Sequence, residues 1–134
     1  MPARLERITK TTNEVIAFLK QHPKIERIVF PFDPSFPQYE LAKQQMTGAC
    51  GLFTIILKNQ SREDIVQFCE SLKHFMMAVS WGGHESLILP KCAGIAPKDY
   101  DASMPDHRYI RVYTGLEDAA YLIKDLEQAL SRLK

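Results

Sequence analysis

The sequence has few of the residues from which a disulfide framework is built. Only three of its 134 residues are cysteine, and Cys50, Cys69 and Cys92 are widely separated. This number and spacing exclude a disulfide-rich scaffold. Because Cys50 and Cys69 lie within apolar segments, we expect buried, reduced thiols and a cytoplasmic location.

An excess of charge and long apolar stretches are also missing. The 17 basic and 16 acidic residues leave a net charge of +1, and no basic run exceeds two residues. We therefore expect neither a nucleic acid nor a membrane as a partner. The N-terminus has no apolar signal segment, and no apolar run is long enough to cross a bilayer.

Motifs for metals and phosphates are absent as well. His22, His74 and His107 show no metal-ligand spacing with any cysteine, so we predict no metal site. Gly82-Gly83 lacks the strand–loop–helix context of a phosphate loop, and no Gly-x-Ser-x-Gly nucleophile elbow occurs. His84 and Glu85 are adjacent and would face apart in a strand.

The residues that are present predict one domain over 1–134. Hydrophobic residues make up 46% of the chain, enough to bury a core. Apolar spacing and capping signals predict four helices: one at 3–21, one at 37–46, one that begins at Ser61 and one that begins after Thr114. Apolar runs predict strands at 25–30, 51–57, 74–79, 85–89 and 109–113. Residues 90–107 are expected to form a loop. This order predicts an α/β (α+β) two-layer fold: a four- to five-stranded, mostly antiparallel sheet with helices on one face.

A further expectation concerns the two faces of the sheet. Strands 51–57 and 74–79 are continuously apolar, which favours cover on both faces. If the helices cover one face only, the bare face is expected to pack against another domain.

Thr114 and Glu117 have the spacing of a capping box at the start of the last helix.

Arg111 is the first candidate functional residue. In a strand, Ile110 and Val112 share one face, while Tyr109, Arg111 and Tyr113 share the other. A guanidinium on a face away from the core matches a carboxylate with two parallel hydrogen bonds. On strand logic alone, a surface arginine paired with an acidic side chain is the favoured interpretation.

The second candidate is Ser80-Trp81-Gly82-Gly83, which follows the apolar run at 75–79. Paired glycines allow a sharp turn or close approach to a ligand. Ser80 can donate to a ligand oxygen, and Trp81 can wall a cleft. A tight turn with a core tryptophan is an equally good interpretation of the same residues.

Four motifs in order resemble the C-terminal domain of the pyridoxal-phosphate-dependent enzymes of Cys/Met metabolism, the transsulfuration family of fold-type I. The segments at 22–28, 40–48, 78–87 and 110–118 read HPKIERI, ELAKQQMTG, AVSWGGHESL and IRVYTGLED. They are similar to the family patterns HPxVxxV, xLAKRQMxG, AxSLGGxESL and IRLSVGLED. The resemblance runs nearly end to end.

The resemblance implies roles for three residues. Arg111 would bind the α-carboxylate of a sulfur amino-acid substrate. Ser80 would order the cofactor-bearing lysine and so contact the cofactor indirectly, and Trp81 would shape substrate entry. Many members have leucine at Trp81, and tryptophan is more typical of bacterial β-lyases. This favours a cystathionine β-lyase-like enzyme, which converts cystathionine to homocysteine, pyruvate and ammonia.

The sequence also departs from the family pattern. Tyr113-Thr114 replaces a common Ser-Val, residues 49–51 replace a Gly-rich step, and 90–107 lacks a His-Pro-Ala-Ser-Met-Thr-His stretch of the γ-enzymes. No lysine lies in the family's Schiff-base context, so we expect no catalytic residue and no covalently bound pyridoxal phosphate in this chain.

The implied partner is therefore a cofactor-binding domain or chain that these residues lack, and the chain alone is expected to be inactive. The complete enzyme would be a homo-oligomer. The alternatives are a stand-alone binding or assembly module, one half of a split enzyme, or a γ-type member such as cystathionine γ-synthase or methionine γ-lyase.

Overall fold

A computed structural model describes all residues, 1–134. The elements, in chain order, are α1 (Pro2–Gln21), β1 (Ile25–Val29), α2 (Tyr39–Gln45), β2 (Leu52–Leu57), α3 (Arg62–Ser71), β3 (Met76–Met77), β4 (Leu87–Pro90), β5 (Ile110–Tyr113) and α4 (Ala119–Leu130). The expected loop at 90–107 contains three short 3-10 helices, at Lys91–Gly94, Pro97–Asp99 and Pro105–Arg108. None of the helices has the length and apolarity needed to cross a membrane.

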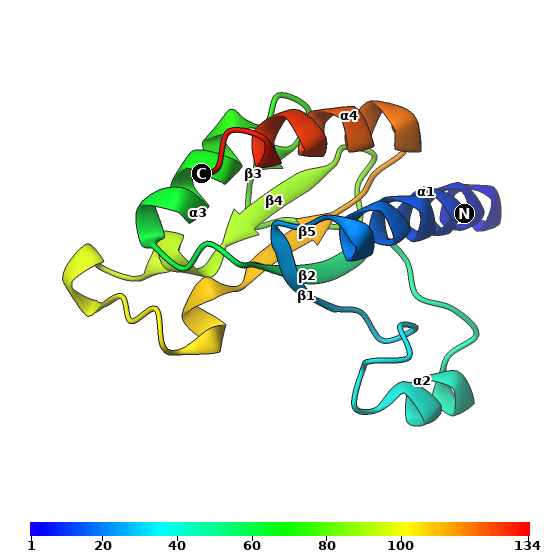
Figure 1. Ribbon diagram of the computed structural model, residues 1–134. Coiled ribbons are helices and arrows are strands. Elements are labelled where there is room, and N and C mark those ends of the chain that lie inside the picture. Colours follow the sequence, from blue (N-terminus) through cyan, green and yellow to red (C-terminus); the bar gives the residue numbers. More distant parts are fainter.

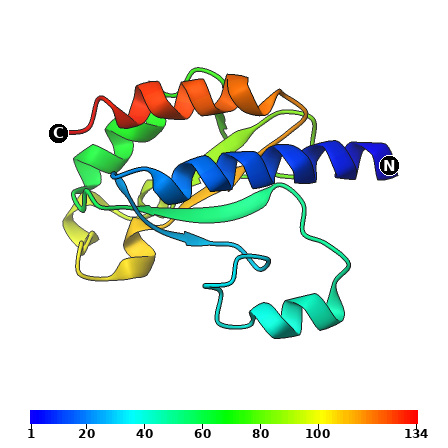
Figure 2. The same cartoon turned by 45° about the vertical axis from the view of Figure 1, so that its right-hand side comes forward.

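The strands form one five-stranded sheet in the order β1-β2-β5-β4-β3. The β1–β2, β2–β5 and β5–β4 pairs are antiparallel, and only β3 runs parallel to its neighbour β4. Helices α1, α3 and α4 lie together over one face, whereas α2 stands apart on the other side (Figures 1 and 2). The predicted two-layer α/β fold with a mostly antiparallel sheet is confirmed.

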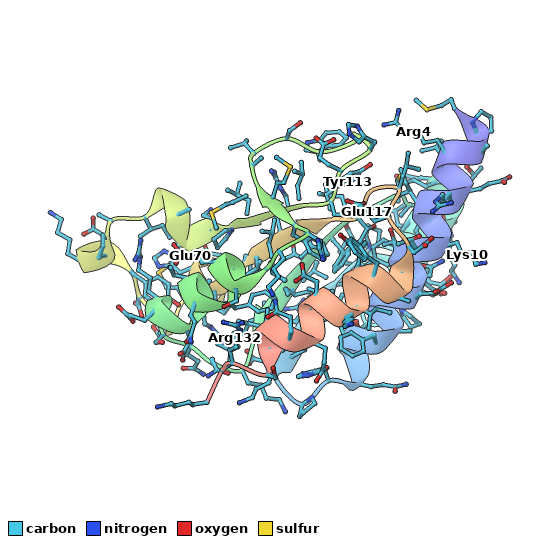
Figure 3. The ribbon with its side chains drawn as sticks, turned by 90° about the horizontal axis from the view of Figure 1, so that it is seen from above. Arg4, Lys10, Glu70, Tyr113, Glu117 and Arg132 are labelled. Atoms are coloured by element: carbon cyan, nitrogen blue, oxygen red, sulfur yellow. The ribbon has the colours of Figure 1, made fainter.

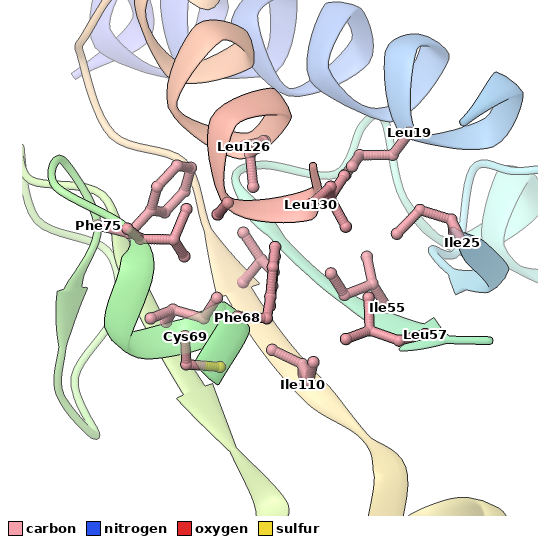
Figure 4. Packing of buried hydrophobic residues seen from close by; sticks show 14 of the residues in the cluster. Leu19, Ile25, Ile55, Leu57, Phe68, Cys69, Phe75, Ile110, Leu126 and Leu130 are labelled. Atoms are coloured by element: carbon pink, nitrogen blue, oxygen red, sulfur yellow. The ribbon is translucent and has the colours of Figure 1, made fainter. Parts of the chain in front are cut away.

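The core lies between the sheet and the three covering helices (Figure 4). Alternate residues of β2 and β5 point into it, because side chains two apart on a strand share a face. Phe68 of α3, Leu126 of α4 and Leu19 of α1 meet these strand residues and are fully buried. Burial of each such side chain contributes about 1.5–3 kcal/mol.

The predicted strand at 74–79 is mostly wrong. Only Met76 and Met77 pair with β4, and their side chains are 63% and 49% exposed. The reason is position: β3 is the edge of the sheet, where one side has no neighbour and no helix covers the apolar side chains. A continuous apolar run does not distinguish this edge from a central strand.

The predicted capping box at the last helix is also wrong. Helix α4 begins at Ala119, after Asp118, and neither member of the pair caps it. The Thr114 hydroxyl instead meets the Thr12 hydroxyl of α1, and Glu117 binds Ser86. The cap predicted at Ser61 is confirmed, since its Oγ accepts the Asp64 N–H at 3.1 Å.

A buried carboxylate organises the proline-rich segment between β1 and α2. Asp33 accepts hydrogen bonds from Lys20 Nζ at 2.6 Å, from the Ser35 N–H at 3.0 Å and from the Ser35 hydroxyl. Burial raises the pKa of Asp33, but the hydrogen bonds from Lys20 and Ser35 outweigh it and leave the pKa below its ordinary value. Tyr39 then starts α2, two residues later than Pro37 predicts, because the Tyr39 N–H still belongs to a turn closed on Phe36.

Candidate functional site

Arg111 lies on the face of the sheet opposite the core. Its neighbours Ile110 and Val112 are fully buried beneath the helices, while Arg111 is half-buried, as strand alternation predicts. It stands between Thr54 of β2 and Leu89 of β4. The placement of the guanidinium away from the core is confirmed.

Arg111 forms no ion pair with an acidic side chain. Its Nη2 donates instead to the carbonyl of Val79, at the end of the edge strand. The interpretation of Arg111 as an ordinary surface ion pair is therefore wrong for this structure. The structure brings Arg111 to the start of the segment that carries Ser80 and Trp81, 32 residues earlier in the chain.

The second candidate segment follows β3 and is exposed. Ser80 and Trp81 both lie at the surface, and Trp81 is 62% exposed. A core tryptophan is therefore excluded, while the tight turn is confirmed: Gly82 has a φ of +86°, which favours glycine. We call residues 79–84 the tryptophan loop.

Side chains and backbone groups of other elements hold the carbonyls of the tryptophan loop. Arg4 Nη2, from the first turn of α1, donates to the Gly82 carbonyl at 2.7 Å. The Tyr113 hydroxyl donates to the Gly83 carbonyl at 2.9 Å, and the Leu116 N–H donates to the His84 carbonyl at 2.8 Å. Figure 3 shows Arg4 and Tyr113 at the same end of the molecule.

Arg4 and Tyr113 are site residues that the sequence analysis missed. Arg4 is 78 residues from Gly82, and no local pattern connects them. Tyr113 could have been found, because it shares the face of Arg111 two residues away. Burial raises the pKa of Tyr113, so its phenol stays protonated and donates.

The far end of the tryptophan loop is fixed by a buried serine. The Ser86 N–H and hydroxyl both donate to the Glu117 carboxylate, at 3.0 and 2.8 Å, and the Ser86 Oγ accepts the Gly115 N–H at 2.9 Å. Gly115 lies so close to the His84 carbonyl that a Cβ there would be 2.2 Å from its oxygen. Only glycine permits this approach.

The adjacent residues His84 and Glu85 do not face apart. His84 Nδ1 lies 3.1 Å from a Glu85 carboxylate oxygen, because the chain turns here and is not a strand. No group of three His, Cys, Asp or Glu side chains is arranged to hold a metal ion. All three cysteines are free; Cys69 and Cys92 are buried and Cys50 is half-buried.

The lysines of the chain do not fit a covalent cofactor site. Reactive Schiff-base lysines are typically desolvated, but every lysine here is exposed except Lys24, whose amine donates to the Lys134 carbonyl. A hollow of about 740 Å³ between α1 and residues 47–50 contains neither Arg111 nor the tryptophan loop. No lysine of this chain therefore has the desolvated surroundings of a Schiff-base lysine.

The fold and the site together define a two-layer α/β domain that presents an arginine beside an exposed, glycine-turned tryptophan loop. The chain belongs to the Cys/Met metabolism PLP-dependent enzyme family, whose model matches residues 1–131. This confirms the resemblance stated above.

Curated relatives match along nearly all of this chain. It is 38% identical over 136 residues to an L-alanine/L-glutamate racemase of Wolbachia pipientis wMel, covering 97% of this chain and 32% of the relative. It is 39% identical over 131 residues to a cystathionine gamma-lyase of Macaca fascicularis, an alignment that covers 95% of this chain and 32% of the relative. It is 33% identical over 138 residues to the cystathionine beta-lyase MetC of Escherichia coli K12, which covers 97% of this chain and 34% of the relative. The chain thus spans about a third of the length of these relatives, and the relatives do not single out a β-lyase.

Proposed function

We propose that this chain is the substrate-recognition domain of a PLP-dependent enzyme acting on sulfur amino acids, and that Arg111 binds the α-carboxylate of the substrate. The observation that carries the proposal is the position of Arg111: off the core face, without an acidic partner, and touching the tryptophan loop. A guanidinium fork there has donors left for a carboxylate.

The roles of the other candidate residues follow from their exposure. Trp81 stands at the surface two residues after Val79, the residue that Arg111 contacts, and can form a wall for the substrate side chain. Ser80 is exposed between Val79 and Trp81, so its hydroxyl is free to turn toward groups of a cofactor-binding domain. Pyridoxal phosphate, when bound by that domain, supplies the electron sink for chemistry at the α-carbon. The residues of this chain hold the carboxylate and shape access.

The preferred reaction is β-elimination of cystathionine, which with one water gives homocysteine, pyruvate and ammonia. Trp81 in place of the common leucine supports it. A second candidate is racemisation, which the similarity to the Wolbachia protein favours. A γ-elimination would instead give cysteine, 2-oxobutyrate and ammonia. All three reactions use an anchored α-carboxylate, so Arg111 has the same role in each.

Product analysis separates these reactions. The chain is co-expressed with a cofactor domain of the same family, and the purified complex is given L-cystathionine or L-alanine. Pyruvate and homocysteine support the β-lyase assignment; 2-oxobutyrate and cysteine, or D-alanine, would replace it with a γ-lyase or a racemase. A chain that never associates with a cofactor domain would favour a stand-alone module.

A further inference from the structure

The tryptophan loop is held at its two ends by different kinds of donor. At Val79 the donor is Arg111, the group proposed to bind a carboxylate. At Gly83 and His84 the donors are the hydroxyl of Tyr113, the last residue of β5, and the N–H of Leu116, which follows β5. Between these ends lies Gly82, whose carbonyl is held only by Arg4.

Arg4 is well suited to hold the turn at Gly82. It lies at the exposed start of α1 and reaches Gly82 with a charge-assisted hydrogen bond of 2.7 Å, stronger than a neutral one. Gly82 has a left-handed φ, a Cβ added there would meet nothing within 4 Å, and its only hydrogen bond is the one that its carbonyl accepts from Arg4. Trp81 is the residue immediately before it.

We propose that Arg4 is a positioning residue: through the Gly82 carbonyl it holds the tryptophan loop, and with it Trp81, in the form in which Val79 contacts Arg111. When Arg111 binds a carboxylate, its guanidinium is shared between the carboxylate and Val79, and the contact at Arg4 adds a second restraint on Trp81. The effect of Arg4 on ligand binding rests on the proposed function of Arg111; its effect on the loop of the free chain does not.

The sole tryptophan of the chain makes this testable, because all tryptophan fluorescence comes from Trp81. The steady-state anisotropy of the free chain is compared for wild type, Arg4→Gln, Arg4→Lys and Lys10→Gln. Lys10→Gln is the matched control, since it removes one exposed positive charge from the same helix. We expect the lowest anisotropy for Arg4→Gln, an intermediate value for Arg4→Lys, which keeps a donor but not the fork, and the wild-type value for Lys10→Gln.

The same variants are then titrated with L-cystathionine, followed by Trp81 fluorescence. The Kd for Arg4→Gln is expected to rise about three- to tenfold, the change that corresponds to the loss of one solvent-exposed hydrogen bond. The proposal would be overturned if Arg4→Gln had the anisotropy of wild type, or if Arg4→Gln and Lys10→Gln lowered the anisotropy by the same amount. If the Trp81 fluorescence of wild type did not change with L-cystathionine, this would count against carboxylate binding by Arg111. The anisotropy of the free chain would then decide whether Arg4 positions the loop.

Discussion

Ser86 and Glu117 join the two segments that form the site. Both hydrogen-bond donors of the fully buried Ser86 end on the Glu117 carboxylate, at 3.0 and 2.8 Å. Glu117 follows β5, which carries Arg111, and Ser86 follows the tryptophan loop. The pair thus sets the spacing between the arginine and the loop.

Glu117→Gln is expected to destabilise the chain by about 1–3 kcal/mol. Glutamine keeps one carbonyl acceptor, so one buried donor of Ser86 loses its partner. Urea unfolding of Glu117→Gln, Ser86→Ala and the double variant measures the coupling. A coupling energy of zero would show that the pair is not an interaction that stabilises the fold.

Gly115→Ala is expected to be strongly destabilising. The added Cβ would meet the His84 carbonyl oxygen at 2.2 Å, a backbone atom that cannot move without displacing the tryptophan loop. Gly94→Ala is the control, because nothing lies within 4 Å of its Cβ and its φ is not positive. Thermal unfolding should give a clear drop in Tm for Gly115→Ala alone; equal values would contradict the close contact.

Asp33 is expected to make stability depend on pH in the acid range. Its pKa is lowered in the folded chain, so its contribution is complete above the unfolded pKa of about 3.9 and is lost as pH falls through the folded pKa. Because Lys20 is half exposed, Asp33→Asn should cost only about 1 kcal/mol at pH 7. Urea unfolding at pH 7 and pH 2 checks this. The difference in the free energy of unfolding between wild type and Asp33→Asn should shrink at pH 2. An equal difference at both pH values would show that the pKa of Asp33 is not lowered by folding.

The lysines are expected to react with pyridoxal phosphate without selectivity. All but Lys24 are exposed, and none lies in a desolvated site. Borohydride reduction of a mixture of the chain and pyridoxal phosphate, followed by peptide mass spectrometry, should show low, scattered modification. One stoichiometric adduct at a single lysine would contradict the prediction that the Schiff-base lysine lies outside this chain.

The parts of the molecule governed by local periodicity could be predicted. Alternation placed Ile110 and Val112 in the core and Arg111 outside it, and Ser61 was identified as a cap from its neighbours. The apolar run before Ser80 predicted a longer, covered strand than the structure contains, because an edge strand and a central strand can have the same composition. Thr114 and Glu117 have capping-box spacing, yet their side chains bind Thr12 and Ser86, partners distant in sequence. Arg4 was missed for the same reason.

A titration of Trp81 fluorescence with L-cystathionine in wild type, Arg111→Gln and Arg132→Gln tests whether Arg111 binds the α-carboxylate. Arg132 is an exposed arginine far from the loop that bonds only within its own helix end. If Arg111 binds the α-carboxylate, wild type and Arg132→Gln give the same saturable change, and Arg111→Gln gives none. Saturable binding of equal affinity in Arg111→Gln would contradict the account.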